Sequence, residues 1–311
     1  MAETGIDILG LGVATVDDLL TVGHFPRVDE KQTIVSRVRQ GGGLTGSAMV
    51  AAARMGYRCG YIITLGEGEL STFLRNELTR EGISLLEREE RPEAEPYHSI
   101  IIIEEKTGNR TILADASKSF PPKIGKVELA LASRVGCIIV DQVYADSLLD
   151  IAEAARRAGT PIVGDFERTQ PGSQELMNLT DHLILPLAYA QQLMGEMTTP
   201  EQAVSTLARR PGRVLACVTD GARGAWYALG ESPNMVMRQP VFAMDRIVDS
   251  TGCGDVFHGV YAAGIVAGLP PAERIRRAAA AAAMKTQKPG AQGGAPTLAQ
   301  LEAFLLQRAG G

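Results

Sequence analysis

Short apolar runs alternate with amphipathic helical patterns along most of this chain, and that alternation limits the fold more than any other feature. The apolar runs, which are typical of buried strands, cover residues 6–12, 61–64, 137–140, 161–165, 182–185 and 214–219. The candidate helices among them include 47–55, 70–81, 147–157 and 201–209. Helices of this kind can connect neighbouring parallel strands. The pattern therefore predicts an α/β fold with a mainly parallel central sheet wrapped by helices.

Two segments interrupt this rhythm and read as strands with no helix between them. Residues 19–40 contain an alternating run at 33–38, and residues 97–113 contain 106–110, which is typical of a hairpin turn. They predict a small projecting β-sheet lid over about 15–40 and 95–116; the alternative is that they are edge strands of one sheet. No internal repeat or linker is visible, so residues 1–311 are expected to form a single domain with this appendage.

Composition and charge exclude several classes of protein. A chain of 311 residues with 45% hydrophobic and 22% charged residues is ordinary for a globular protein. Its formal net charge of −5 gives no general attraction to nucleic acid or acidic membranes, so neither is expected as a partner. No run reaches the roughly 18 apolar residues of a membrane span, and the first residues do not resemble a secretion signal. A cytoplasmic location is expected, with the four scattered cysteines as buried free thiols.

The most informative segment, 249–259, places two glycines around a small residue directly before an apolar helical pattern. Gly252, Cys253 and Gly254 would leave backbone N–H groups free at a helix N-terminus, which favours anion binding. Asp255 follows, where it could meet a hydroxyl that receives a phosphoryl group. The positive helix end is expected to keep Asp255 ionised and weakly basic, which phosphoryl transfer tolerates because the proton moves late. The alternative is a helix cap after a tight turn.

This segment closely resembles the DTxGAGD signature of the PfkB, or ribokinase-like, carbohydrate kinases. Three further motifs resemble the same family in the same order: an opening strand ending in an aspartate at 10–17, a GG-containing substrate loop and helix at 41–56, and a TxGxxG-like nucleotide turn at 218–224. The resemblance spans nearly the whole chain. It implies a ribokinase-like three-layer α/β/α domain with a β-sheet lid, and an ATP-dependent sugar kinase that requires Mg2+.

The resemblance also implies roles for particular residues. Gly252, Cys253 and Gly254 would form the anion hole, with Asp255 as the catalytic base. Asp249 is a candidate ligand for a monovalent cation such as K+, and the alternative is a hydrogen bond that fixes the loop. The residues implied to bind ATP are Thr219, Gly221, Gly224, Thr251, Ala279, Ala283 and Gly290. The residues implied to hold sugar hydroxyls are Asp17, Gly42, Gly43 and Ser47.

The family pattern fails at 186–189, where many relatives carry NxxE and this chain has neither Asn nor Glu. The outer ligand of Mg2+ is therefore not assigned. The glycine loop and the segments 255–259 and 285–290 look most like the branch containing sulfofructose kinase, with ketohexokinase a more distant cousin. Lys31 in the lid could meet an anionic sugar substituent, or it could protect a sheet edge. Because no arginine lies near 142–144, a neutral ketose or related polyol is favoured.

Two other functions stay open at this point. A nucleoside kinase on the same fold would need a clamp for the base, for which Phe25 and Tyr97 are the candidates. A sugar-binding regulator without turnover would not need Asp255. Exposed edges of the lid further predict a homodimer formed through the lid.

Overall fold

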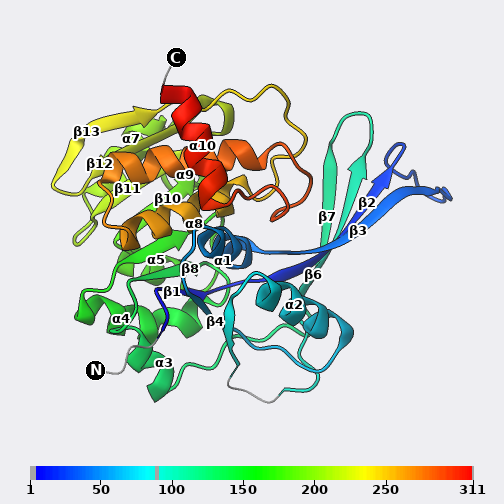
Figure 1. Ribbon diagram of the computed structural model, residues 1–311, viewed down its shortest axis with the longest axis horizontal. Helices are drawn as coiled ribbons and strands as arrows, with labels where there is room; N and C mark the ends of the chain where they lie inside the picture. The colour runs from blue at the N-terminus through cyan, green and yellow to red at the C-terminus, as the bar shows by residue number, and fades with distance from the viewer. Residues whose placement is uncertain (1–4, 88–90, 310–311) are drawn as a thin grey trace.

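The main body of the protein is built on one large sheet (Figure 1). A computed structural model describes residues 5–87 and 91–309 and gives a nine-stranded sheet with the order β13-β12-β11-β10-β9-β8-β1-β4-β5. All neighbouring pairs from β5 to β11 are parallel, while β12 and β13 form an antiparallel edge, so the predicted parallel sheet is confirmed. The strands are β1 (Ile8–Leu11), β4 (Cys59–Ile62), β5 (Ser84–Leu86), β8 (Cys137–Asp141), β9 (Ile162–Asp165), β10 (His182–Pro186), β11 (Leu215–Thr219), β12 (Ala225–Leu229) and β13 (Ser232–Gln239).

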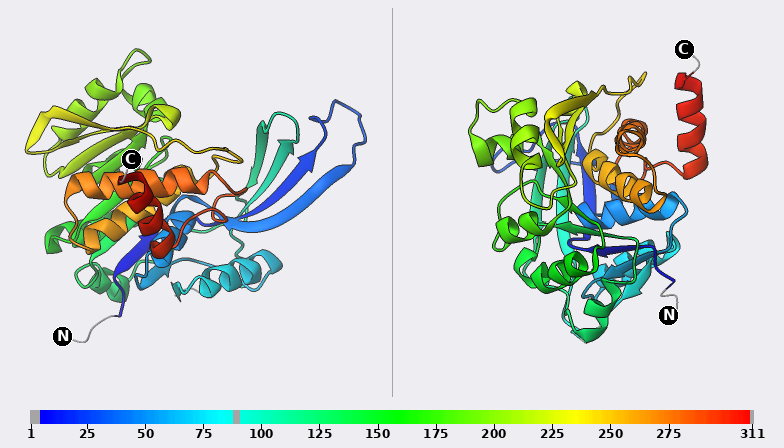
Figure 2. Two further views of the ribbon diagram at one scale, coloured as in Figure 1. Left: turned by 45° about the horizontal axis from the view of Figure 1, so that its top comes forward. Right: turned by 90° about the vertical axis from the view of Figure 1, so that its left-hand side faces the viewer.

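Helices cover both faces of this sheet, and each face has its own apolar core (Figure 2). The three-layer arrangement expected from the family resemblance is therefore confirmed. One face packs against α1 (Leu44–Arg54), α2 (Glu69–Arg80), α8 (Cys253–Val266), α9 (Pro271–Lys285) and α10 (Leu298–Ala309). The other packs against α3 (Lys126–Leu131), α4 (Leu149–Ala158), α5 (Ser173–Leu179), α6 (Leu187–Met194) and α7 (Pro200–Ala208). Two short 3-10 helices cover Ala145–Leu148 and Gly221–Arg223.

Helices α1 and α8 meet at a glycine. A Cβ added to Gly259 would lie 2.1 Å from the carbonyl oxygen of Ala48, so the close approach of the two backbones requires a residue without a side chain. Both residues lie within the first two turns of their helices. The N-termini of α1 and α8 therefore meet at the same edge of the sheet.

A separate four-stranded sheet with the order β3-β2-β6-β7 projects from the body as the lid (Figures 1 and 2). It contains the two segments that lacked helices in the sequence, and the prediction of a separate small sheet is confirmed. Strands β2 and β6 are parallel, and the two outer pairs are antiparallel. The strands are β2 (Thr15–Val22), β3 (Ile34–Gly42), β6 (Tyr97–Glu104) and β7 (Arg110–Asp115).

Alternation along β2 gives the lid two different faces. Asp17 points to one face and Asp18 to the other. The Asp18 carboxylate accepts hydrogen bonds from Nε and Nη2 of Arg39 at 3.0 and 2.9 Å and lies 2.8 Å from Nε2 of His98. The Arg39 guanidinium holds the pKa of Asp18 well below its usual range. This ion cluster ties β3, β2 and β6 together near the base of the lid.

Parallel strands β1, β8 and β9 end at a common edge of the main sheet, and the lid begins there. The chain passes from β1 into β2, and β3 leads directly into α1. Within residues 5–87 and 91–309, no helix is both long and apolar enough to span a membrane.

Candidate active site

The carboxylate of Asp141, at the end of β8, organises the edge where the lid meets the body. It accepts hydrogen bonds from the N–H of Val13 at 2.8 Å, the N–H of Val143 at 2.7 Å and the hydroxyl of Thr45 at 2.7 Å. These groups belong to the turn after β1, the loop after β8 and the first turn of α1. Burial raises the pKa of Asp141 to about 6, against the effect of these hydrogen bonds. One side chain thus fixes three segments, a role that no pattern in the sequence indicated.

The predicted sugar-binding residues lie together at the base of the lid. Asp17 is buried and accepts a hydrogen bond from the Thr15 hydroxyl at 2.7 Å, and burial raises the pKa of Asp17. Gly42 lies directly against it, since an added Cβ would be 2.1 Å from Asp17 Oδ2. Gly43 has φ 86°, a conformation that favours glycine. Among the described residues the buried hydroxyl of Ser47 has no hydrogen-bond partner, so it is free to bind a ligand hydroxyl.

Lys31 does not belong to this cluster. It is exposed and lies in the loop just before β3 begins. Gln40, which pairs with Asp17 across the lid, lies roughly 20 Å further along β3, at about 3.3 Å per residue. The structure therefore does not bring Lys31 to the predicted sugar-binding residues of its own chain.

The turn before α8 has the open backbone expected of an anion site. Gly252 has φ 78°, and a Cβ there would lie 2.5 Å from the carbonyl oxygen of Ala291, so no other residue fits without displacement. The space around Gly254 is open, because a Cβ added there would have no atom within 4 Å apart from its chain neighbours and its own helix. The N–H of Cys253 donates to the carbonyl oxygen of Ser250 at 3.3 Å. The N–H groups of Gly254 and Asp255 belong to the first turn of α8, where amides lack partners within the helix. A ligand can therefore approach them closely.

Asp249, the candidate cation ligand, makes hydrogen bonds within its own loop. Its Oδ1 accepts the N–H of Thr251 at 2.8 Å, and its Oδ2 accepts the N–H of Gly290 at 2.7 Å. These bonds join the turn before α8 to the loop after α9. Asp249 thus performs the loop-fixing role that was the alternative at the level of sequence.

Asp255 lies in the first turn of α8, where the helix end was expected to keep its pKa low. The structure reverses that expectation: burial raises the pKa of Asp255 well above the ordinary value, and the charges of Glu167, Asp141 and Asp17 raise it further. Lys285 opposes this shift. A carboxylate with a raised pKa is a stronger proton acceptor than an ordinary aspartate, so Asp255 is better suited to act as a base than the sequence predicted.

A cleft of about 430 Å³ extends from this turn to α9. Its volume is within the range typical of small-molecule sites. Cys253 and Gly254 line it beside the anion turn. Thr251 and Gly290 are not among its lining residues, although both bond to Asp249 nearby. The predicted ATP-binding residues that do line it are Thr219, Gly221, Gly224, Ala279 and Ala283.

The remaining wall of the cleft was not predicted. It is the loop 241–247, which contributes Val241, Phe242, Met244 and Ile247. With the alanine side chains of α9 it encloses an apolar space suited to a planar ring. These apolar residues follow neither a helical nor a strand periodicity, so no pattern in the sequence would assign them to a site. The one signal was that several apolar residues occur just before the anion turn.

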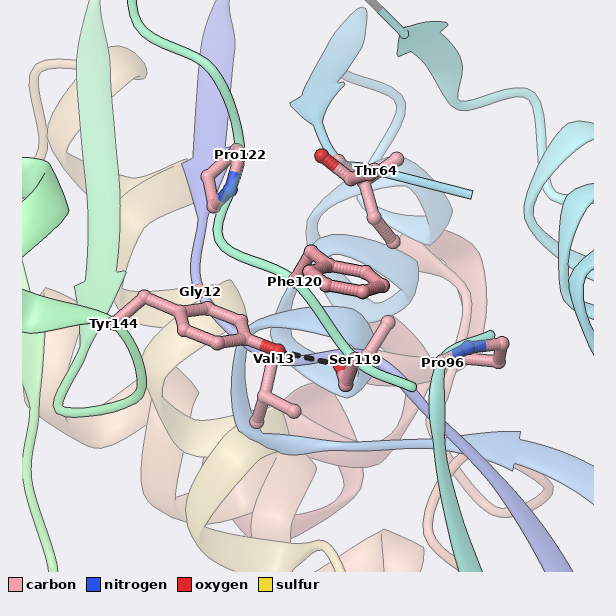
Figure 3. A pocket seen from close by; sticks show the side chains of 10 residues that line it. Gly12, Val13, Thr64, Pro96, Ser119, Phe120, Pro122 and Tyr144 are labelled. Carbon is pink, nitrogen blue, oxygen red and sulfur yellow. Dashed lines mark hydrogen bonds between the residues drawn. The ribbon is translucent and has the colours of Figure 1, made fainter. Parts of the chain in front are cut away.

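A much smaller cavity lies beside the turn after β1 (Figure 3). Tyr144, which shares a hydrogen bond with the Ser119 hydroxyl, closes it together with Phe120. The Tyr144 backbone has φ 63°, which is strained for an aromatic residue. The ring of Tyr97 packs edge-on against Tyr144 at a centroid distance of 6.3 Å. The cavity of about 10 Å³ has room for roughly one water molecule, and none of the predicted sugar-binding residues lines it.

Comparison with known proteins gives a consistent family. Residues 13–298 match the model of the pfkB family carbohydrate kinases. The chain is 24% identical over 300 residues to the ribokinase of Bacillus subtilis (strain 168), covering 96% of this chain and 99% of that one. Its structure is similar to the ribokinase of Thermotoga maritima, with TM-score 0.83, 22% identity and coverage of 97% and 99%. It is also similar to the Arabidopsis thaliana ribokinase complexed with ribose and ATP, with TM-score 0.82, 20% identity and coverage of 96% and 98%.

A fold and a site of this kind define a kinase that phosphorylates an alcohol group of a small molecule. The chain belongs to the pfkB family of carbohydrate kinases, since the family model covers nearly all of it. Where many relatives carry the NxxE pattern, this chain has Leu187 and Tyr189. Both are buried in the apolar core on the second face of the sheet.

Replacement of the proposed base gives the first prediction. Asp255→Asn should reduce turnover at least ~100-fold, because an amide cannot accept the proton, while affinity for an ATP analogue stays near that of the wild type. Wild-type turnover should fall as the pH is lowered through the raised pKa of Asp255, so the acid limb should lie above the ordinary aspartate value of about 3.9. ADP release against pH measures both. Asp150→Asn, an exposed acid in the first turn of α4, is the control and should change neither. Undiminished turnover in Asp255→Asn would discredit the assignment.

The contact between Gly42 and Asp17 gives the second prediction. Gly42→Ala should raise KM for the sugar roughly tenfold or more, because overpacking of about 1–3 kcal/mol falls on the carboxylate at the sugar site. Affinity for nucleotide should not change. Gly23→Ala is the matched control, since it lies in the lid and no described atom lies within 4 Å of an added Cβ. Saturation kinetics and nucleotide titration separate the two effects, and an unchanged KM would show that Gly42 does not face the sugar.

Proposed function

We propose that the protein is an ATP-dependent sugar kinase that transfers the γ-phosphoryl group of ATP to a hydroxyl of a small sugar. The position of Asp255 supports this proposal. It follows Cys253 and Gly254, which line the large cleft, and the charge of Asp17 contributes to its raised pKa. Asp255 can therefore serve a nucleotide on one side and a polyol on the other.

In this mechanism the adenine ring occupies the apolar space between the alanines of α9 and Phe242. The N–H groups of Gly254 and Asp255 at the start of α8 receive phosphate oxygens and stabilise the charge that develops on the transferred group. Asp17 holds hydroxyl groups of the sugar, and Asp255 orients the attacking hydroxyl. Because the transition state is loose, Asp255 takes the proton late, as the new O–P bond forms.

Mg2+ would supply charge neutralisation at the β- and γ-phosphates. In kinases it is held mainly by phosphates and waters, with one or two carboxylates. Glu167 is exposed and close enough to Asp255 to raise its pKa, so it could hold waters of such an ion in place of the missing NxxE pattern. Asp165 Oδ2 is buried nearby, but His258 Nδ1 already lies 3.2 Å from it. The residues present thus fit a nucleotide-borne Mg2+.

The sugar side of the site favours a small acceptor over a nucleoside. Tyr97, one of the candidate clamps for a base, is instead packed against Tyr144. Because the ribokinase of Arabidopsis thaliana binds ribose, ribose joins the neutral ketoses as a candidate substrate.

A thermal-shift panel tests this choice. The protein with Mg2+ and a non-hydrolysable ATP analogue is heated with D-ribose, D-fructose or adenosine. A ligand at 100 times its Kd stabilises the folded state by about 2.7 kcal/mol, so an accepted sugar should raise the unfolding temperature clearly. Adenosine should not, and the stabilising sugar should release ADP when ATP is supplied. Phosphorylation of adenosine alone would establish a nucleoside kinase, and sugar binding without ATP turnover would establish a regulator.

We also propose that two copies pair through the lid. Val38, Leu19, Ile101 and Ile112 are consecutive partners in one row across the four strands, next to the row that contains Asp17. The two outer members of the row, Val38 and Ile112, are 53% and 50% exposed. An apolar row at the rim of a projecting sheet is a surface that a second copy of the lid could cover.

Sedimentation analysis tests the dimer. The wild type should sediment as a dimer at micromolar concentration, and Ile112→Lys should shift it toward monomer by placing a charge in the apolar row. Thr111→Lys is the matched control, because Thr111 is exposed on the opposite face of the same strand. A monomeric wild type would refute the pairing.

A further inference from the structure

Lys285 is buried in a way that is rare for lysine. It is the last residue of α9, and its relative exposure is 0%. Lysine side chains are almost never fully buried unless the ammonium group has partners. Here Nζ donates a hydrogen bond to the backbone carbonyl oxygen of Asp249 at 2.9 Å and lies 4.0 Å from Asp249 Oδ2.

These contacts place the ammonium group directly behind the anion turn. The N–H groups of Val248 and Asp249 donate to the carbonyl oxygen of Thr286 at 2.8 and 3.1 Å, so two chain segments are joined around Lys285. The turn that carries Cys253 and Asp255 follows within a few residues. The charge of Lys285 acts on both, because it opposes the upward pKa shift of each.

The charges around Lys285 favour a retained positive charge. Burial lowers the pKa of Lys285, whereas Asp249, Cys253 and Asp255 act in the opposite direction. Arg110, from the lid, adds to the lowering. The ammonium group thus lies near the Asp249 carboxylate, with a backbone carbonyl oxygen to accept its hydrogen bond.

The surroundings of Asp249 do not fit a bound monovalent cation. Both of its carboxylate oxygens already accept a backbone N–H, at 2.8 and 2.7 Å. An ion at that carboxylate would also face the Lys285 ammonium group 4.0 Å from Oδ2, a like charge in a site with little water to screen it. The expected role of Asp249 as a K+ ligand therefore conflicts with what surrounds it.

We infer that Lys285 is a built-in cation: its ammonium group supplies, behind the anion turn, the positive charge that a bound monovalent ion could supply, so that this kinase works without K+. Lys285 is a positioning residue, since it acts on the phosphate-binding amides through Asp249. The inference rests on the proposed nucleotide site. It extends that proposal by stating what holds the turn in place and what the enzyme does not need.

The test is binding of a non-hydrolysable ATP analogue with Mg2+ to the full-length protein, in potassium chloride and in tetramethylammonium chloride at equal ionic strength. Wild-type affinity, measured by calorimetry, should agree within about twofold between the salts. In tetramethylammonium, Lys285→Ala should bind the ATP analogue roughly tenfold more weakly or worse, because a hydrogen bond from a charged donor is lost together with the charge. Potassium should restore much of that affinity, since alanine leaves room for an ion.

Two further variants separate charge from volume. Lys285→Met fills the same space without charge and should show the loss without recovery in potassium. Lys288→Met, an exposed lysine in the next loop, should behave as the wild type. Thermal unfolding in both salts shows whether each variant is folded.

Each outcome decides the inference. A wild type whose affinity rises tenfold or so in potassium, or a folded Lys285→Ala that binds normally in tetramethylammonium, would overturn it. If the variants at 285 do not fold, the wild-type comparison alone decides, with equal affinity as support. Absence of nucleotide binding by the wild type in either salt would instead defeat the proposed function, and the role of Lys285 with it.

Discussion

The arrangement of the site depends on one buried carboxylate, Asp141. A buried charge is costly unless hydrogen bonds compensate it, and here the compensating donors come from three segments that would otherwise be independent. Val13 lies only two residues before the first strand of the lid, and Thr45 lies at the start of α1. The hinge of the lid and the first turn of α1 are therefore held to the end of β8. Because α8 packs closely against α1 at Gly259, this connection also helps to hold Asp17 in place relative to Asp255.

Electrostatic balance explains why the anion site needs support from several directions. Asp17, Asp141, Asp165 and Asp255 gather at one edge of the sheet, and an incoming nucleotide adds more negative charge. The repulsion strengthens Asp255 as a proton acceptor, but it also opposes phosphate binding. Amide dipoles at the start of α8 offset part of this repulsion, since they point outward where Gly254 leaves open space. The Lys285 ammonium group, which lies behind the turn before α8, offsets a further part of this repulsion.

The sequence predicted what depends on local pattern and missed what depends on burial. The alternation of strands and helices and the separate small sheet followed from periodicity alone. The turn at Gly252 was visible because a positive φ requires glycine in the sequence itself. The contribution of Phe242 to the cleft and the contacts of Asp141 depend on segments far away in the chain. The predicted pKa of Asp255 was too low for the same reason. The helix end is a local feature, whereas the carboxylates that raise this pKa come from other elements.

Helix α9 shows how a single element couples two parts of the site. Ala279, Ala282 and Ala283 face the cleft, whereas Ala278, Ala281 and Lys285 follow the helical period along the stripe that is turned to the core. A lysine at the end of such a stripe is tolerable only because the segment at Asp249 presents a carbonyl oxygen to it. The wall of the cleft and the Lys285 ammonium group therefore belong to one helix. A shift of α9 that widened the cleft would also pull the ammonium group away from Asp249, so the shape of the cleft and the positive charge behind the turn before α8 cannot vary independently.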